Sequence, residues 1–309
     1  MIYNLLMNYL AFAFGLIILI FGANYFIKYA VSIAKHLRLN IVVFGAVIIA
    51  IGTSLPELAI TVESAFNNQP EIIIGNILGS NIANIGLVLG ISLLLGKITP
   101  KNINLNNRNL LLVILSFVFL GLVLFKLLFW PFGIFLLIIA SFLIFDLYKN
   151  RDQQLILPTK KINNSILNYF LLILCLTGVI IGSQIVINSS LSIAETWGIT
   201  ISAFAATIIA VGTSLPELAV TLFAIKRKEH GLAIGNIIGS NLFNLVLIGG
   251  MGAIITNLSV TISLSLIIFF IFFTIAAYLL VKGSIKPKSY HGAVLICLYA
   301  IFVIFEYLS

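Results

Sequence analysis

The sequence contains few charged residues. Asp, Glu, Lys and Arg together make up 8% of its 309 residues, whereas 61% are hydrophobic. A soluble domain normally carries roughly a quarter charged residues. This composition therefore excludes an ordinary soluble protein and indicates a membrane protein with several spans.

Cysteine and histidine are also scarce, with two and three residues. Cys175 and Cys297 lie within apolar runs and supply no metal-ligand cluster, so we interpret them as packing residues. The phosphate-loop pattern G-x-x-x-x-G-K-[ST] is absent, which argues against ATP-driven transport and a nucleotide partner. We therefore expect no bound cofactor.

Long apolar runs dominate the chain instead. Because a helix needs about 20 apolar residues to cross a bilayer, the runs predict ten spans. These are 8–29, 41–66, 71–95, 109–125, 129–148, 165–187, 199–225, 231–255, 259–281 and 291–308. The first run lacks the basic start and small-residue cleavage site of a signal peptide, so we expect it to stay as a span.

The basic residues support this span count. Sixteen of the 17 Lys and Arg residues lie in, or at the edges of, the loops that follow odd-numbered spans, and only Lys126 follows an even-numbered one. Because basic loops stay in the cytoplasm, both termini are predicted to be extracytoplasmic. The net charge of +8 is thus an orientation signal in a cell-membrane protein rather than a nucleic-acid surface.

Two motifs occur twice at the same spacing. The sequence "GTSLPE" occupies 52–57 and 212–217, and "GNILGSNIAN" at 75–84 returns as "GNIIGSNLFN" at 235–244, so both are offset by 160 residues. One shared offset indicates a duplication.

The duplication predicts residues 1–150 as a first five-helix repeat and 165–309 as a second, with 151–164 as a cytoplasmic linker. The motif regions are 50–57 and 75–84 in the first repeat, and 210–217 and 235–244 in the second. Because five spans is an odd number, the second repeat enters the membrane from the opposite side. The predicted fold is an all-α polytopic membrane protein of two inverted repeats, as in many secondary transporters.

Each first motif predicts a broken helix in span two or seven. Pro56 cannot donate a backbone hydrogen bond to the carbonyl of Gly52, and Pro216 repeats this relation with Gly212. We expect the first helix to open around residues 50–54. Carbonyls freed inside a membrane need a partner, and a cation is a natural one.

Glu57 and Glu217 are the two acidic residues that the span map places deep in the membrane. A buried carboxylate is costly there, and no basic residue lies at the same depth to neutralise it. Hydroxyls and amides in the motifs complete an oxygen-only shell, which suits hard cations such as Ca²⁺. One Ca²⁺, two Na⁺ or two protons would neutralise two carboxylates, which provides a physical basis for antiport.

The paired motifs resemble the α-repeats of the Ca²⁺/cation antiporter superfamily, and more narrowly those of prokaryotic sodium/calcium exchangers. The resemblance covers the whole chain. It implies that Glu57 and Glu217 are shared by Ca²⁺ and Na⁺ and that spans one and six slide across the other eight. The ion ligands that it implies are Ala50 (carbonyl), Thr53, Ser54, Glu57, Ser80 and Asn84 in the first repeat, and Ala210 (carbonyl), Thr213, Ser214, Glu217, Ser240 and Asn244 in the second.

The chain departs from some relatives at one position. Some carry an aspartate in place of Asn84 or Asn244, whereas both residues are amides here. An acid at such a position accompanies potassium co-transport in some branches, so its absence argues against potassium dependence. The cation/proton branch usually has a different first motif. The absence of that motif from this sequence favours sodium as the coupling ion.

We therefore expect a secondary antiporter, not an enzyme, that exports Ca²⁺ in exchange for Na⁺ by alternating access. Ca²⁺, Na⁺ and the lipid bilayer are its expected partners, a monomer suffices, and the cycle is electrogenic if more than two Na⁺ enter per Ca²⁺. Three alternatives stay open at this stage: a Ca²⁺/H⁺ antiporter, a passive cation channel, and an intramembrane hydrolase that uses the two glutamates as an acid–base pair.

Overall fold

The structure is a computed structural model that describes residues 2–37, 41–95, 108–149, 166–196, 212–282 and 284–308. Every regular element in these ranges is helical, and the elements labelled η are π-helical segments. The first half contains α1 (Ile2–His36), α2 (Ile41–Phe44), η1 (Gly45–Ile49), α3 (Ala50–Thr53), α4 (Leu55–Phe66), α5 (Pro70–Ala83), η2 (Asn84–Leu89), α6 (Gly90–Leu94), α7 (Arg108–Leu124) and α8 (Trp130–Lys149). The second half contains α9 (Ile166–Thr196), α11 (Leu215–Lys226), α12 (His230–Phe243), η4 (Asn244–Ile248), α13 (Gly249–Ile255), α14 (Leu264–Lys282) and α15 (Ser289–Leu308).

Six helical stretches in the described ranges are long and apolar enough to cross a membrane. They are Leu6–Ala34, Pro70–Leu94, Ile166–Ser190, His230–Ile255, Leu264–Lys282 and Ser289–Glu306. Gly45–Thr53 and Leu55–Phe66 make a seventh if this pair, bent by 52°, counts as one span, and Arg108–Leu124 and Trp130–Phe145 are shorter apolar helices. The expected span 199–225 begins outside the described residues, and α11 covers its second half.

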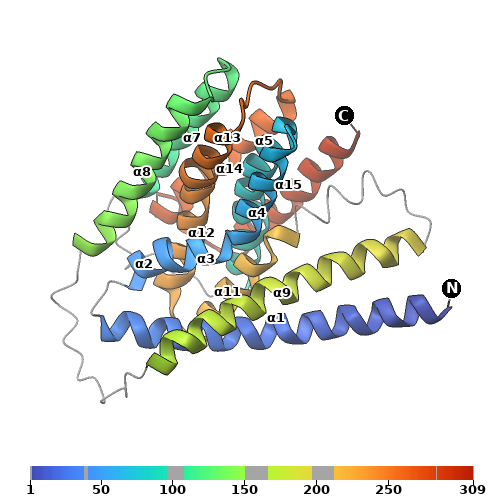
Figure 1. Cartoon of the computed structure of the whole chain (residues 1–309). Coiled ribbons are helices and arrows are strands. Elements are labelled where there is room, and N and C mark those ends of the chain that lie inside the picture. Colours follow the sequence, from blue (N-terminus) through green and yellow to red (C-terminus); the bar gives the residue numbers. More distant parts are fainter. Residues whose placement is uncertain are drawn as a thin grey trace.

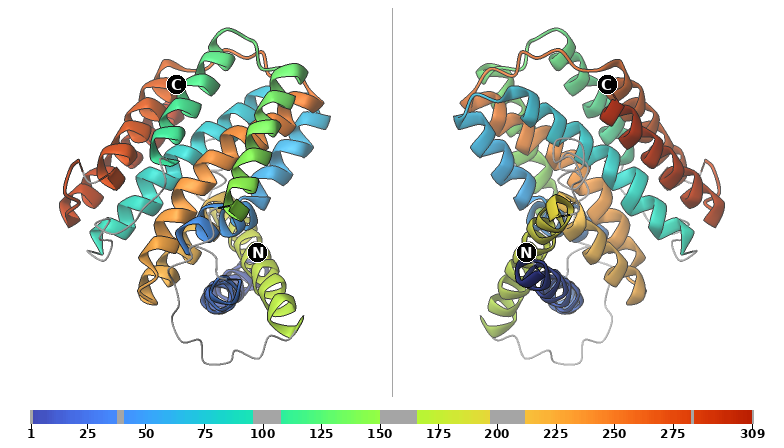
Figure 2. Two further views of the ribbon diagram at one scale, coloured as in Figure 1. Left: turned by 90° about the vertical axis from the view of Figure 1, so that its left-hand side faces the viewer. Right: turned by 90° about the vertical axis from the view of Figure 1, so that its right-hand side faces the viewer.

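Helices α1 and α9 lie side by side across one end of the helix bundle, steeply inclined to the other helices (Figure 1 and Figure 2). Glycine allows them to approach closely. A Cβ atom on Gly182 of α9 would lie 2.6 Å from the backbone nitrogen of Leu19 and 2.9 Å from the carbonyl oxygen of Gly15, both on α1. Apart from each other, these two helices contact mainly α11, α2 and α3.

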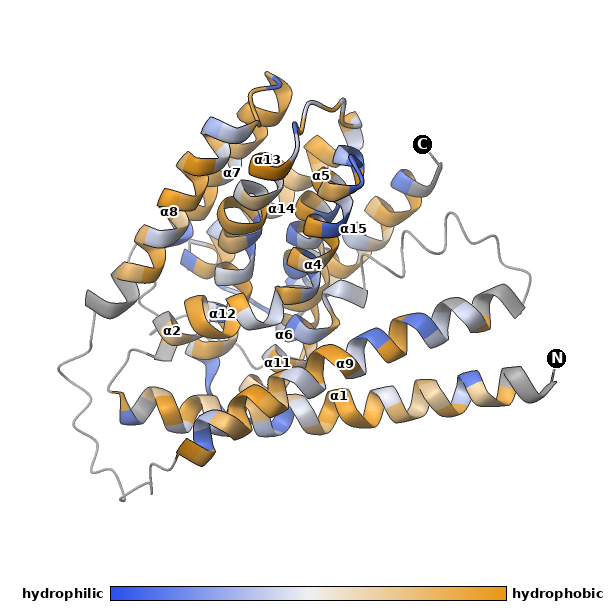
Figure 3. Ribbon diagram, viewed as in Figure 1, coloured by the Kyte–Doolittle hydropathy of each residue, from blue (hydrophilic) through white to orange (hydrophobic). Residues whose placement is uncertain are grey.

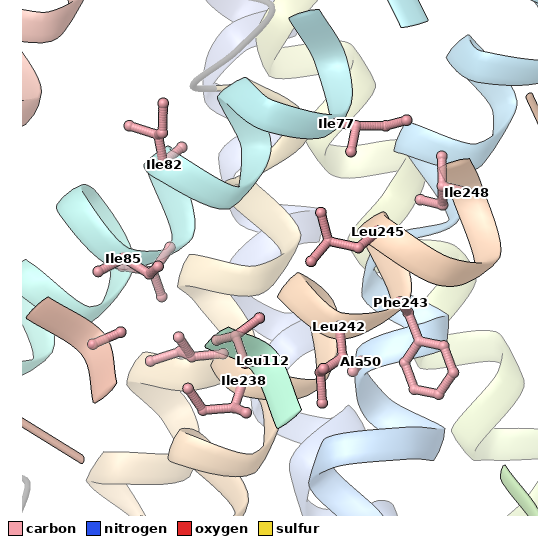
Figure 4. Packing of buried hydrophobic residues seen from close by; sticks show 14 of the residues in the cluster. Ala50, Ile77, Ile82, Ile85, Leu112, Ile238, Leu242, Phe243, Leu245 and Ile248 are labelled. Atoms are coloured by element: carbon pink, nitrogen blue, oxygen red, sulfur yellow. The ribbon is translucent and has the colours of Figure 1, made fainter. Parts of the chain in front are cut away.

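The core of the bundle is apolar and draws on both halves of the chain. Figure 4 shows Ile77 of α5, Leu112 of α7, Leu242 of α12 and Leu245 of η4 packed in the interior. Most residues of the helices are hydrophobic (Figure 3), and many large hydrophobic side chains lie on the outside. Side chains such as Phe142 on α8 are largely exposed, as expected of a surface that meets lipid.

The turn from α4 to α5 and the turn from α11 to α12 have the same structure. Asn68 and Lys228 have positive φ angles of 53° and 63°. The next amide in each turn, that of Gln69 or Glu229, donates to a carbonyl five residues back at 2.9 Å. This combination is the Schellman helix ending. The two turns are 160 residues apart, at the offset of the repeated motifs.

The second motif packs α12 tightly against the start of the broken helix. A Cβ atom on Gly239 would overlap the backbone of Ala46 in η1, and one on Gly235 would overlap the backbone of α2. Small residues four positions apart allow helices to approach closely, and Gly235 and Gly239 do so here. For Gly75 and Gly79, no described atom lies within 4 Å of such a Cβ, and the sequence equivalents of α2 and η1 fall outside the described residues.

We predict that Gly239→Ala destabilises the protein, because the added methyl group must displace backbone rather than a flexible side chain. Overpacking of this kind costs about 1–3 kcal/mol. Gly121→Ala on α7 is the matched control, since no described atom lies within 4 Å of its Cβ and alanine favours the helix. Thermal unfolding in one detergent measures both. A midpoint temperature of unfolding for Gly239→Ala as high as that of Gly121→Ala would contradict the close contact between Gly239 and Ala46.

Candidate cation-binding site

The first motif bends the chain at Ser54. Helix α3 ends at Thr53 and α4 begins at Leu55, with Ser54 between them at φ −86° and ψ 12°. Pro56 lies in the first turn of α4, where its missing N–H has no intrahelical partner to lose. Glu57 occupies the same turn, so the positive end of the helix dipole favours its carboxylate.

The second copy of the motif has the same local structure. Ser214 precedes α11 with φ −85° and ψ 1°, and Pro216 and Glu217 lie in the first turn of that helix. The described residues begin at Gly212 here, so the predicted ligand Ala210 lies outside them. In both copies the glutamate lies three residues after a non-helical serine.

The carbonyls near these bends already have hydrogen-bond donors. The carbonyl of Ala50 accepts from the Ser54 amide at 3.0 Å and from the Thr53 hydroxyl at 3.3 Å. The carbonyl of Gly212, which Pro216 deprives of its helical donor, accepts from the Ser183 hydroxyl of α9 at 3.0 Å. The sequence predicts that the helix opens around residues 50–54, but α3 stays helical up to Thr53, so the break is confined to Ser54. Hydroxyl groups also donate to the carbonyls of Ala50 and Gly212.

The second motif ends in a π-helical segment in each half. Ser80 and Ser240 lie in the last turns of α5 and α12, and Asn84 and Asn244 begin η2 and η4. A π-bulge widens one turn of a helix and is frequent at functional sites. Nothing in the sequence indicates this change of helix type.

All of the predicted ligand residues within the described ranges are buried. Glu57 is 1% exposed and Glu217 is fully buried. The others are Ala50, Thr53, Ser54, Ser80, Asn84, Thr213, Ser214, Ser240 and Asn244, each no more than 3% exposed. The site is thus closed off from its surroundings.

Hydrogen bonds bring the two motif copies together around Glu217. The Ser54 hydroxyl donates to Glu217 Oε1 at 3.0 Å, and the Ser240 hydroxyl donates to the same oxygen at 3.5 Å. The hydroxyls of Thr53 and Ser240 lie 3.5 Å apart. The structure therefore joins residues that are more than 150 positions apart in the sequence.

Several buried oxygen atoms in the same group have no hydrogen-bond partner among the described residues. They are both carboxylate oxygens of Glu57, Oε2 of Glu217, the hydroxyls of Ser80 and Ser214, and the amide oxygens of Asn84 and Asn244. Buried polar atoms almost always have a hydrogen-bond partner, so several unpartnered oxygens among the predicted ligands need a physical cause. Carboxylate, hydroxyl and amide oxygens are the ligands of hard cations.

The donor set does not fit a transition-metal centre. No group of three or more His, Cys, Asp or Glu side chains gathers within the ranges that the structure describes. The two glutamates are the acidic members of a predicted ligand set whose other members are neutral. Such a set can hold one divalent cation or two monovalent cations without excess charge.

Two asparagines that the sequence analysis did not single out hold the acidic turns in place. Asn76 of α5 donates to the Glu57 carbonyl at 3.0 Å and to the Thr61 hydroxyl at 3.2 Å. Asn236 of α12 makes the equivalent bonds to the Glu217 carbonyl at 3.5 Å and the Thr221 hydroxyl at 3.1 Å. Their signal in the sequence was their repetition at the 160-residue offset, as the second letter of each "GN-x-x-GSN" motif.

A second pair of overlooked asparagines joins the two copies. Asn81 donates to the carbonyl of Asn241 at 3.3 Å, and Asn241 donates to the carbonyl of Asn81 at 3.2 Å. Asn84 also donates to Oδ1 of Asn241 at 3.0 Å. The helices α5 and α12, which carry the second motifs, are therefore held face to face by amide groups.

Comparison with known proteins connects this site with ion exchange. The family model described as sodium/calcium exchanger protein matches the chain twice, over residues 7–148 and 167–308. The second match begins and ends 160 residues after the first. The sodium/calcium exchanger MaX1 of Methanosarcina acetivorans is 32% identical, with 96% of this chain and 97% of the relative covered. An uncharacterised membrane protein of Methanocaldococcus jannaschii is 36% identical, with 76% of this chain and 77% of the relative covered.

Solved structures agree with the sequence matches. The sodium-calcium exchanger NCX_Mj, soaked with 2.5 mM Na⁺ and 0.1 mM Ca²⁺, matches with a TM-score of 0.79 at 31% identity, covering 96% of this chain and 98% of that chain. NCX_Mj soaked without either ion matches with a TM-score of 0.77 at 31% identity. The chain belongs to the sodium/calcium exchanger protein family.

Proposed function

We propose that this protein is a secondary-active antiporter that exports Ca²⁺ in exchange for Na⁺. The observation that carries the proposal is the pair of buried carboxylates, Glu57 and Glu217, three of whose four oxygens lack a hydrogen-bond partner among the described residues. The hydroxyl groups that contact Glu217 bring no positive charge. Cations must then supply the counter-charge, and one Ca²⁺ or two Na⁺ balance the two carboxylates equally well.

The proposed ligands are the residues implied by the motifs. They are Ala50, Thr53, Ser54, Glu57, Ser80, Asn84, Ala210, Thr213, Ser214, Glu217, Ser240 and Asn244. The burial of the described members and their unpartnered oxygens support this assignment. The hydrogen bonds at the Ala50 carbonyl indicate that it contributes a lone pair only when one of its present donors moves away.

The proposed architecture is ten spans in two inverted five-helix repeats, residues 1–150 and 165–309, with 151–164 as a cytoplasmic linker. Helices two and seven are broken at Ser54 and Ser214. Three features support this arrangement: the family model matches twice at a 160-residue offset, the two Schellman turns share that offset, and Asn81 and Asn241 bond reciprocally. The proposed location is the cell membrane, and the distribution of basic residues supports an orientation with both termini extracytoplasmic.

Alternating access is proposed to involve α1 and α9. These helices pack on each other and touch the rest of the bundle mainly at α11, α2 and α3. Helix α11 carries Glu217 in its first turn, and α3 ends just before the helix that carries Glu57. A shift of the pair would therefore change which side of the site is covered. Sodium is favoured over protons as the coupling ion because the named relatives are sodium/calcium exchangers. A monomer contains the complete ligand set.

We predict that Glu57→Gln and Glu217→Gln each abolish Na⁺-dependent Ca²⁺ uptake into proteoliposomes. Removing one of two charges from a buried site should cost about 3 kcal/mol or more of Ca²⁺-binding free energy. This corresponds to a loss of at least about 100-fold in Ca²⁺ affinity. Glu63→Gln is the matched control, because Glu63 lies on the same helix α4 but is exposed. Normal uptake by either site variant, measured with radioactive Ca²⁺, would remove that residue from the ion path.

We predict that Asn84→Ala and Asn244→Ala weaken Ca²⁺ transport without abolishing it. Each substitution removes one neutral ligand and leaves both carboxylates, so the concentration of Ca²⁺ at half-maximal rate should rise about five- to tenfold. Initial rates over a range of Ca²⁺ concentrations measure the change. Loss of all transport in either variant would show that the amide does more than supply a neutral oxygen.

We predict that the exchange is electrogenic. When vesicles are loaded with Na⁺, an inside-positive potential should accelerate Ca²⁺ uptake, because more than two positive charges leave with Na⁺ for each Ca²⁺ that enters. Potassium gradients with valinomycin set the potential, and the ionophore without a gradient serves as the control. Uptake that does not respond to the potential would indicate exchange of two Na⁺ for one Ca²⁺.

A further inference from the structure

Asn84 and Asn244 occupy equivalent positions in the two motifs, but their surroundings differ. The amide nitrogen of Asn84 donates to Oδ1 of Asn241 at 3.0 Å. Neither the nitrogen nor the oxygen of the Asn244 side-chain amide has a hydrogen-bond partner among the described residues, and Oδ1 of Asn81 has none either. The equivalent bond of the other repeat, from the Asn244 amide nitrogen to Oδ1 of Asn81, is thus not formed.

The direction of the Asn84 bond is fixed by a backbone group. The carbonyl oxygen of Asn81 can only accept a hydrogen bond, so the Asn241 atom that lies 3.2 Å from it must be the amide nitrogen. The other end of the Asn241 side chain is therefore the oxygen, which can only accept. The Asn84 atom that faces it must then be nitrogen, and the Asn84 oxygen must point the other way. Amide orientation is otherwise ambiguous, but this chain of donors and acceptors leaves one choice.

The outward-pointing oxygen of Asn84 is buried and unpartnered. It shares this lack of a partner with both carboxylate oxygens of Glu57, the charged member of the proposed ligands in the first repeat. A ligand that is held in its binding orientation before the ion arrives loses less conformational freedom on binding. A residue that hydrogen-bonds to a metal ligand and orients it commonly affects metal affinity as strongly as some of the ligands do.

We infer that Asn241 is a positioning residue that holds the Asn84 amide with its oxygen facing the cation. The inference rests on the proposed function, in which Asn84 is an ion ligand. It assigns unequal roles to the two equivalent amides: Asn84 is oriented before binding, whereas Asn244 is oriented by the ion itself. Asn81, the sequence equivalent of Asn241, orients no ligand.

The matched pair Asn241→Leu and Asn81→Leu separates positioning from helix packing. Each substitution removes one amide-to-carbonyl bond between α5 and α12, and only Asn241→Leu also frees Asn84. We expect Asn241→Leu to raise the half-maximal Ca²⁺ concentration about fivefold, the factor for one hydrogen bond of ordinary strength. Asn81→Leu should change it by less than about twofold. The maximal rate should be unchanged in Asn241→Leu, since a general packing defect would lower that rate instead.

A double-mutant cycle that combines Asn241→Leu with Asn84→Ala tests whether Asn241 affects Ca²⁺ affinity through Asn84. If Asn241 acts through Asn84, adding Asn241→Leu to Asn84→Ala should not weaken Ca²⁺ affinity further. Multiplied losses in the double variant, or equal losses in Asn241→Leu and Asn81→Leu, would overturn the inference. If leucine does not fit, Asn241→Ala and Asn81→Ala repeat the comparison. An unchanged Ca²⁺ affinity in Asn84→Ala itself would instead remove Asn84 from the proposed ligands, a distinct failure.

Discussion

Two carboxylates buried without a positive partner determine how the rest of the site is built. Glu57 and Glu217 each sit in the first turn of a helix that follows a bend, where the helix dipole supplies partial positive charge. Asn76 and Asn236 hold the carbonyls of these turns. The close contact of α12 with η1 brings the hydroxyls of one motif copy to the carboxylate of the other. The helix dipoles and the hydroxyl donors lower the cost of keeping two negative charges inside, and in the proposed function a bound cation supplies the remaining counter-charge.

The hydrogen bonds around the site do not follow the internal repetition of the sequence. Ser54 donates to Glu217, whereas the equivalent Ser214 hydroxyl has no hydrogen-bond partner in the described part of the chain. Ser183 of α9 donates to the Gly212 carbonyl, whereas its equivalent on α1 is Ala23, which has no hydroxyl. In the proposed alternating-access cycle the site opens to two sides in turn. Unequal bonds at equivalent positions make the two halves of the site different, and under that proposal the difference is a physical basis for two separate states.

Much of this organisation could be predicted from repetition in the sequence. The shared offset of 160 residues located both motifs, and the scarcity of charge made Glu57 and Glu217 stand out. The described members of the predicted ligand set are all buried, and hydrogen bonds join Ser54 and Ser240 to Glu217. The π-helical segments at Asn84 and Asn244 could not be predicted, because helix type within an apolar run depends on tertiary packing. The donors that occupy the Ala50 and Gly212 carbonyls were also missed. Ser183, which donates to Gly212, belongs to a different helix, and no spacing in the sequence indicates such a contact.

The central claim is that Ca²⁺ and Na⁺ compete for one site formed by the two carboxylates. Equilibrium binding of radioactive Ca²⁺ to the purified protein, repeated at increasing Na⁺ with the ionic strength held constant by choline, tests it directly. The account predicts that Na⁺ displaces Ca²⁺ with a Hill coefficient above one, because more than one Na⁺ replaces each Ca²⁺, and that the Glu57→Gln/Glu217→Gln double variant binds no Ca²⁺. Ca²⁺ binding that is insensitive to Na⁺, or that persists in the double variant, would contradict it.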